Sequence, residues 1–496
     1  VEGPIQYPAE SNIEERAPEF DMNEYSVFNY DHDVPASDEI MKDLHWTEFK
    51  ARPVSAHMEH VEILSHPDLY PQGVTGLFSP RPVPFTAKTK YLYWDSRFAL
   101  ADKRFSTNCN LIYEQSDVIT QSQINSGLYL YHSTGQNKFH SKASFEKAIL
   151  SKDKDLLKSI DRIMQNVTGS PQYMERERRR LKALDQEWGP AHLFVTLSCN
   201  EHDWPDLHRY LQRKHPEITD WQLRNNATGV MNKYPMSFMY YWNLRVQAFK
   251  NAMLYPRDKK TNKLLVSIFG KLVLHHYLRT EFQARGAPHV HMKLWLEGGP
   301  INGEATEHEF LNFVAKNITC RLPDQDTEHD LFSLVNRYQR HKCKPSYCYS
   351  TKKRSKLLKS GVLKCRGGFP RVVNSELKMN TTESVIKGRV LKKTRKFLYT
   401  IVRMVEECYV NDYHPAILLA WRGNCDIQMI SESSYVLNRY LTNYITKKEK
   451  GSTSGKYMNV DQMQSITSKA RSILNQFTAT REMSIMEASM RCHRYD

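Results

Sequence analysis

Two alternating segments joined by a short connection restrict the fold of this chain more than any other feature. Residues 274–283, LHHYLRTEFQ, and residues 289–296, HVHMKLWL, both alternate between two kinds of side chain. A period of two is typical of β-strands. The connection between them, ARGAP, contains glycine and proline and has the length of a hairpin loop. The sequence therefore predicts an antiparallel β-hairpin.

The strands of this hairpin divide their side chains between two faces. In the second strand, His289 and His291 share one face, because strand side chains alternate. We expect a half-buried strand whose polar face is open. That face carries His289, His291, Lys293 and Trp295 in the second strand and His275, Tyr277, Arg279, Glu281 and Gln283 in the first; the apolar face of the second strand carries Val290, Met292, Leu294 and Leu296.

The polar face predicts a metal site. Folding the hairpin brings Glu281 or Gln283 to the face that carries the two histidines. Two imidazoles and one oxygen donor leave coordination positions open on a divalent cation, as a protein that binds a substrate oxygen requires. Mg²⁺ or Mn²⁺ is the expected ion, because phosphate oxygens complete the shells of these ions. The alternative is a pair without a metal, since a chain with 20 histidines contains such pairs by chance.

The charge of the chain is unevenly distributed. Residues 1–60 contain 14 acidic and 4 basic side chains, whereas the remaining residues contain 66 basic and 41 acidic ones. A large basic body favours a polyanionic partner, most simply nucleic acid. The alternative is a solvated basic surface without such a partner. Arg285, Lys293 and Lys447 are among the candidate DNA-binding residues.

Length and cysteine usage set further limits. A chain of 496 residues is too long for one ordinary core, so two to four domains are expected. Nine scattered cysteines and no opening signal peptide indicate a reducing compartment, where thiols stay free or bind metal. The sequence contains no apolar run of about 18 residues, so no membrane span is expected. Because the sequence begins at Val1 rather than methionine, we expect a fragment of a longer protein.

The order of predicted elements indicates an α+β fold with a mainly antiparallel sheet. Residues 1–88 are expected to be irregular, and helices dominate from Lys88 to about Glu187, including residues 144–167 and 173–188; a strand at 191–200, a helix at 234–254, the hairpin, and a strand at 425–431 follow. The expected regions are an acidic N-terminal region (1–88), a helical DNA-binding region (89–187), the first part of the core (188–304), a basic Cys/His insert (305–400), the second part of the core (401–480) and a C-terminal junction (481–496).

The insert carries one imidazole and three thiols that predict a zinc site. The four residues are His341, Cys343, Cys348 and Cys365. Four soft ligands are enough for a closed tetrahedral shell. Their spacing is irregular, and unrelated thiols near a loop are the alternative. Basic residues lie between the cysteines, where a phosphate backbone would meet them: Lys352, Lys353, Arg354 and Lys356.

A predicted helix over residues 433–450, SSYVLNRYLTNYITKKEK, carries two tyrosines. Tyr440 and Tyr444 are four residues apart and therefore project from a common face. Lys448 extends that face by a turn, and Lys447 lies close to it. A phenol, with a free pKa of about 10, becomes a useful nucleophile when a metal polarises the phosphate under attack and a cation favours phenolate. The alternative is a pair of aromatic residues that pack in a core.

These features occur in an order that resembles a known class of proteins. The chain resembles the HUH class of rolling-circle nucleases, in which two histidines flank a hydrophobic residue, here Val290. More narrowly, it resembles the replication-initiator half of Helitron transposases from about residue 58 onward. Seven segments carry the resemblance in the family's order: VEILSHPDLYPQG, WDSRF, LFVTLSCNEHDWPDL, EFQARGAPHVH, CRGGFP, YHPAILLAWRGNCDIQ and RYLTNYITK.

The resemblance implies an HUH-type nuclease fold and a specific chemistry. The family's histidine pair falls on His289 and His291, and its third metal ligand falls on Gln283, with Glu281 as second choice. Its two nucleophiles fall on the tyrosines of the predicted helix. The implied activity is that of a metal-dependent single-stranded DNA endonuclease and strand-transferase, which cleaves transposon ends and target through a 5′-phosphotyrosine in the nucleus.

The resemblance also implies two partners, single-stranded DNA and a C-terminal helicase. Full Helitron proteins continue into that helicase, yet no GxxxxGK[ST] phosphate loop occurs in this sequence. We therefore expect the chain to end just before it, at REMSIMEASMRCHRYD. A rival from a different class is a non-catalytic nucleic-acid-binding protein whose histidines and cysteines hold only structural zinc. A third is a related viral or plasmid replication initiator.

Overall fold

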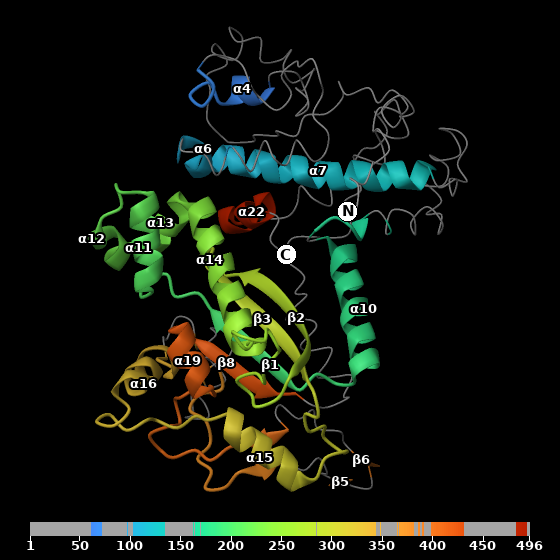
Figure 1. Cartoon of the computed structure of the whole chain (residues 1–496), viewed down its shortest axis with the longest axis vertical. Helices are drawn as coiled ribbons and strands as arrows, with labels where there is room; N and C mark the ends of the chain where they lie inside the picture. The colour runs from blue at the N-terminus through green and yellow to red at the C-terminus, as the bar shows by residue number, and fades with distance from the viewer. Residues whose placement is uncertain are drawn as a thin grey trace. The chain divides into compact units, whose positions relative to one another are not determined.

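A computed structural model places the chain in two compact units (Figure 1). The first comprises Val1–Met174, Tyr234–Met236 and Glu449–Tyr495, and the second comprises Glu175–Lys233 and Ser237–Lys448, together with Asp496. The chain therefore passes between the units more than once. The structure describes residues 61–71, 97, 103–133, 162, 164–168, 170–283, 285–343, 348, 365, 367–380, 385–386, 389–390, 398–430 and 483–493.

The described part of the first unit is helical. It contains α4 (Val61–Ser65), α6 (Lys103–Thr107), the long helix α7 (Cys109–Ser133) and α22 (Ile485–Cys492). The last helix begins where the Ser484 hydroxyl accepts a hydrogen bond from the backbone of its first turn. Helices α7 and α22 pack together, although they lie at opposite ends of the sequence. Their shared core contains Ile112, Val118, Ile119, Met236, Ala488 and Cys492.

The second unit is a mixed α+β structure, as the sequence predicts. Its main sheet consists of β1 (Leu193–Ser198), β2 (Val273–Phe282), β3 (Pro288–Leu296) and β8 (Cys425–Met429). In the described part of the chain, no helix has the length and apolar character to cross a membrane. The remaining elements are α10 (Pro171–Trp188), α11 (Pro205–Lys214), α12 (Asp220–Asn225), α13 (Ala227–Lys233), α14 (Pro235–Phe249), η2 (Lys250–Leu254), α15 (Glu307–Asn317), α16 (His329–Leu334), η3 (Val335–Gln339), α19 (Pro415–Trp421) and the two-residue strands β4 (Lys378–Met379), β5 (Val385–Ile386), β6 (Arg389–Val390) and β7 (Tyr399–Thr400).

The main sheet is antiparallel throughout, with the strand order β2-β3-β1-β8 (Figure 1). The predicted hairpin is confirmed as β2 and β3, and the strands predicted at 191–200 and 425–431 are confirmed as β1 and β8. The predicted helices at 173–188 and 234–254 are α10 and α14, the latter continued by the π-helix η2. Most of the helix predicted at 144–167 lies outside the described residues.

The expectation of an open polar face on β3 is wrong: along this strand only His289 is partly exposed, and His291 is buried. Lys293 and Trp295 are 1% and 0% exposed. Helix α10 covers this end of the face, where Leu181 packs with Phe194 and Tyr277 in the same core cluster as Trp295. Alternation in the sequence assigned the side chains of β3 to the correct faces. It carried no information about helix α10, which covers one of those faces.

Two polar contacts attach α10 to the sheet. The Lys293 ammonium lies 3.0 Å from an Asp185 carboxylate oxygen, and the Tyr277 hydroxyl donates to Glu177 at 3.0 Å. Burial lowers the pKa of Lys293 and raises the pKa of Asp185, although the opposite charge of each partner resists the shift. The pair is therefore an ion pair removed from solvent, which is stable only while both partners are present.

An aromatic cluster fixes the end of β1 that approaches the two histidines. The Arg245 guanidinium of α14 lies 4.1 Å from the Trp204 ring centroid and donates to the Trp421 carbonyl of α19 at 2.6 Å. The Trp421 indole in turn donates to the Ser198 carbonyl at 2.7 Å. These contacts tie two helices to the last residue of β1.

We predict that Lys293→Met lowers the free energy of unfolding by about 3–5 kcal/mol, because the substitution leaves Asp185 buried without its partner. Adding Asp185→Leu should recover most of that loss, since an apolar pair of similar volume needs no ion partner. Urea unfolding followed by circular dichroism measures both variants. A single variant as stable as the parent would show that the pair does not hold α10 on the sheet.

Candidate functional site

The β2–β3 hairpin brings one carboxylate against two imidazoles. Glu281 is directly opposite His289 in the register, and His291 lies two residues further along the same face. One oxygen of Glu281 lies 3.2 Å from Nε2 of His289 and 3.0 Å from Nε2 of His291. The ligand atoms all lie within 4.8 Å of one another, so this group, termed the hairpin cluster, could hold a metal ion.

The neighbouring strand β1 holds one of the two imidazoles in place. His291 is buried, its Nδ1 lies 2.9 Å from the Thr196 hydroxyl, and its ring stacks on Phe194 at 5.6 Å between centroids. The Nδ1 of His289 is also buried, but it has no hydrogen-bond partner among the described residues. The two histidines therefore differ in how firmly their rings are oriented.

The members of the hairpin cluster perturb one another's protonation. Burial acts to raise the pKa of Glu281, but hydrogen bonds from His289 and His291 outweigh burial and hold that pKa well below its usual range. Burial also lowers the pKa of His291 and outweighs the Glu281 carboxylate, which acts to raise it. An ionised carboxylate beside a neutral imidazole offers the lone pairs that a cation needs.

This donor set fits a divalent cation with free coordination positions. Donor atoms about 3 Å apart have the spacing of adjacent ligands around a six-coordinate ion. Two imidazoles and a carboxylate leave positions for substrate oxygens. The sequence left the third ligand open between Glu281 and Gln283. The oxygen against both imidazoles belongs to Glu281, whereas Gln283 follows the end of β2, where its backbone N–H donates to the Ala287 carbonyl at 2.9 Å.

Two of the candidate DNA-binding residues lie in the described part of the chain. Arg285, in the hairpin turn, is 47% exposed along its side chain, and its Nε donates to the buried Glu201 carboxylate at 2.9 Å. Lys293 is buried with Asp185, so its ammonium does not face a solvent-borne phosphate. The remaining candidates lie outside the described residues: Lys352, Lys353, Arg354, Lys447, and the catalytic candidates Tyr440, Tyr444 and Lys448.

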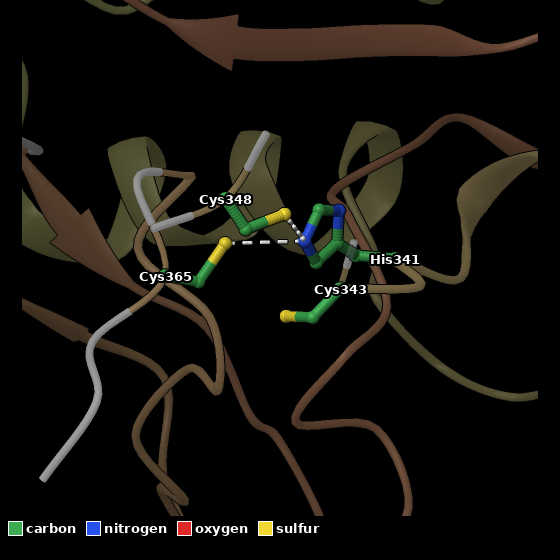
Figure 2. Close-up of side chains that lie close together, drawn as sticks. All are labelled: His341, Cys343, Cys348 and Cys365. Carbon is green, nitrogen blue, oxygen red and sulfur yellow. Dashed lines mark hydrogen bonds between the residues drawn. The ribbon is translucent and has the colours of Figure 1, made fainter. Parts of the chain in front are cut away.

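A second cluster gathers the four predicted ligands of the insert, and Figure 2 shows their side chains converging. Two thiols approach the same nitrogen of the His341 imidazole, with Nε2 at 3.1 Å from Sγ of Cys365 and 3.5 Å from Sγ of Cys348. Cys343 completes the set, and the four ligand atoms lie within 4.8 Å of one another. This Cys/His cluster could bind zinc, because one nitrogen and three sulfur ligands suit a tetrahedral ion.

The surroundings of the Cys/His cluster suit a bound cation. The Phe369 ring stacks on the His341 imidazole at 4.5 Å between centroids. The Gly367 N–H donates to Sγ of Cys365 at 3.3 Å. Burial acts to raise the pKa of Cys365, but this bond and those from Cys348 and Cys343 outweigh burial and lower it. A lowered thiol pKa favours the thiolate, the form that binds metal.

Sequence reasoning missed two residues that support the hairpin cluster. Thr196 lies in the strand predicted at 191–200, and its contact with His291 depends on the pairing of β1 with β3. Glu201, which holds the hairpin turn through Arg285, follows β1 by three residues. No spacing in the sequence relates either residue to the hairpin, because the separations exceed 80 residues.

We predict about one tightly held zinc per chain after exhaustive dialysis, because four convergent soft ligands close a tetrahedral shell. Cys348→Ser should lower both the zinc content and the melting temperature, since structural zinc contributes folding free energy. Elemental analysis and thermal unfolding measure the two effects. Cys408→Ser is the matched control, because this thiol lies outside the cluster. Full zinc retention by Cys348→Ser would refute the assignment of Cys348.

Residues 89–294 match the family model described as the Helitron helicase-like domain at the N-terminus. The matched segment includes β1, β2 and both histidines of the hairpin cluster, and it ends within β3. No curated protein matches the chain. Over residues 89–294 the chain is therefore similar to the Helitron helicase-like domain.

Proposed function

We propose that this protein is a metal-dependent single-stranded DNA endonuclease and strand-transferase of a rolling-circle transposase. The observation that carries the proposal is the hairpin cluster, in which Glu281 meets both His289 and His291. Similarity to a Helitron domain over residues 89–294 supports it, because that segment contains the cluster. The net charge of +15 supports a nucleic-acid partner.

The hairpin cluster would hold Mg²⁺ or Mn²⁺, with Glu281 as the third ligand in place of Gln283, which the resemblance put first. When bound, such an ion would supply Lewis-acid polarisation of the phosphate that is cleaved. Tyr440 attacks the phosphorus, so that a bond forms between its phenolic oxygen and phosphorus while the bond to the 3′-oxygen breaks. The phenolic proton passes to the departing 3′-oxygen, with Lys448 supporting the charge. Transfer of the phosphoryl group to Tyr444 or to a DNA 3′-hydroxyl conserves the energy of the phosphodiester bond. The joining step therefore needs no ATP.

The Cys/His cluster would hold structural zinc and present the insert to DNA. Within the insert, Lys352, Lys353 and Arg354 would contact phosphates, as would Arg285 beside the hairpin cluster. We further propose that the protein acts in the nucleus and that a C-terminal helicase supplies its single-stranded substrate.

One experiment separates this proposal from the rival of a non-catalytic zinc protein. The protein is incubated with a labelled single-stranded oligonucleotide that carries the transposon end, with Mg²⁺, Mn²⁺ or chelator, and then run on a denaturing gel. A metal-dependent covalent protein–DNA band supports the enzyme. Shifted mobility in a native gel without any covalent band under either metal favours the binding protein.

Alanine at both His289 and His291 should reduce cleavage to background and leave DNA affinity mostly intact. The reason is that contacts with many phosphates supply non-specific affinity, whereas the cluster acts on one phosphate. Cleavage gels and fluorescence anisotropy measure the two quantities. His275→Ala serves as control, because this imidazole lies on the same face of β2 but against Trp295. A parallel loss of affinity and activity would indicate misfolding or a binding role.

Phenylalanine at Tyr440 should remove the covalent adduct in a single-cleavage assay, whereas phenylalanine at Tyr444 should leave most of it. The substitution removes only the hydroxyl, so packing is nearly unchanged. Denaturing gels quantify the adduct. Equal adduct from both variants would mean interchangeable nucleophiles. Normal adduct from the double variant would exclude both tyrosines from the mechanism.

A further inference from the structure

We propose that Thr196 is a positioning residue for the hairpin cluster, whose hydroxyl fixes the ring of His291 so that Nε2 faces the cation. The inference rests on the proposed function, because it assigns a role toward the metal site named there. It adds a residue from a third strand, β1, to a site that the sequence placed within the β2–β3 hairpin alone.

The geometry comes from strand pairing. Thr196 is directly opposite His291 in the β1–β3 register, so both side chains lie on one face of the sheet. The hydroxyl lies 2.9 Å from Nδ1, and Nε2 of the same ring lies 3.0 Å from the Glu281 carboxylate. Both ring nitrogens are thus engaged from opposite sides, which leaves the buried ring one orientation.

A hydroxyl is the appropriate group at this position. It can donate to Nδ1 when Nε2 carries the proton, and it can accept from Nδ1–H when the Nε2 lone pair is given to a cation. A partner on the second nitrogen of a metal-binding histidine sets its tautomer and orientation. On the other edge of β1, Asp426 is also opposite Thr196, but its carboxylate accepts from Asn411 and Gln428.

The same strand contains an internal comparison. Ser198 is opposite His289 in the register, as Thr196 is opposite His291. Nδ1 of His289, however, has no hydrogen-bond partner among the described residues, so the Ser198 hydroxyl does not hold that ring. Ser198→Ala therefore removes a hydroxyl from the same strand and the same face without removing a histidine contact.

The test measures Mn²⁺ binding directly by low-temperature electron paramagnetic resonance on the full chain, with no DNA present. Thr196→Val keeps the β-branched shape and removes the hydroxyl, and Thr196→Ser restores the hydroxyl. We expect Thr196→Val to weaken Mn²⁺ binding by about 10- to 100-fold. Thr196→Ser and Ser198→Ala should stay near the parent affinity. The His289→Ala/His291→Ala protein identifies the signal that belongs to the hairpin cluster.

Each result has a defined meaning. Parent-like Mn²⁺ affinity in Thr196→Val, or an equal loss in Ser198→Ala, overturns the role of Thr196 and leaves the proposed function standing. A parent chain whose Mn²⁺ signal is unchanged by the double histidine substitution overturns the metal site itself, and the inference with it. If valine prevents folding, the comparison of Thr196→Ala with Thr196→Ser replaces it, because those two variants differ only in the hydroxyl.

Discussion

The register between β2 and β3 is the constraint on which the hairpin cluster depends. It sets Glu281 opposite His289 and keeps His291 on the same face. A slip of one residue on β3 would turn both imidazoles to the apolar face, where Val290 now lies, because side chains alternate with a period of two. The second edge of β3 prevents such a slip, since β1 pairs along it and places Thr196 against His291. Three strands, and not a flexible loop, determine the positions of the ligand atoms.

Much of this arrangement could be predicted from local patterns. Alternation identified both strands of the hairpin and the side on which each residue lies, because the period of the pleat is a property of the backbone alone. The candidates for the third ligand, Glu281 and Gln283, have the same parity, so alternation could not decide between them. Only the pairing of β2 with β3 distinguishes the two candidates, because it puts the Glu281 carboxylate against both imidazoles.

Contacts between distant segments could not be predicted in the same way. Lys293 carries a charge on a face that looked solvated, yet its partner Asp185 lies 108 residues earlier on α10. Burial of such a pair depends on a tertiary contact that neither segment encodes by itself. The Cys/His cluster was identified by residue type. Because the four residues are irregularly spaced, the sequence could not show that their side chains converge, and the fold shows that they do. Tyr440 and Tyr444 remain predictions, since they lie outside the described residues.

The position of β8 in the sheet has a consequence for biosynthesis. β1, β2 and β3 all lie between Leu193 and Leu296, but the strand that covers the outer edge of β1 begins only at Cys425. At roughly 5–20 residues per second, the intervening chain takes on the order of ten seconds to synthesise. During that time an apolar strand edge stays unpaired, and such edges template aggregation. The insert between β3 and β8 thus lengthens the interval between synthesis of β1 and synthesis of the strand that pairs with its outer edge.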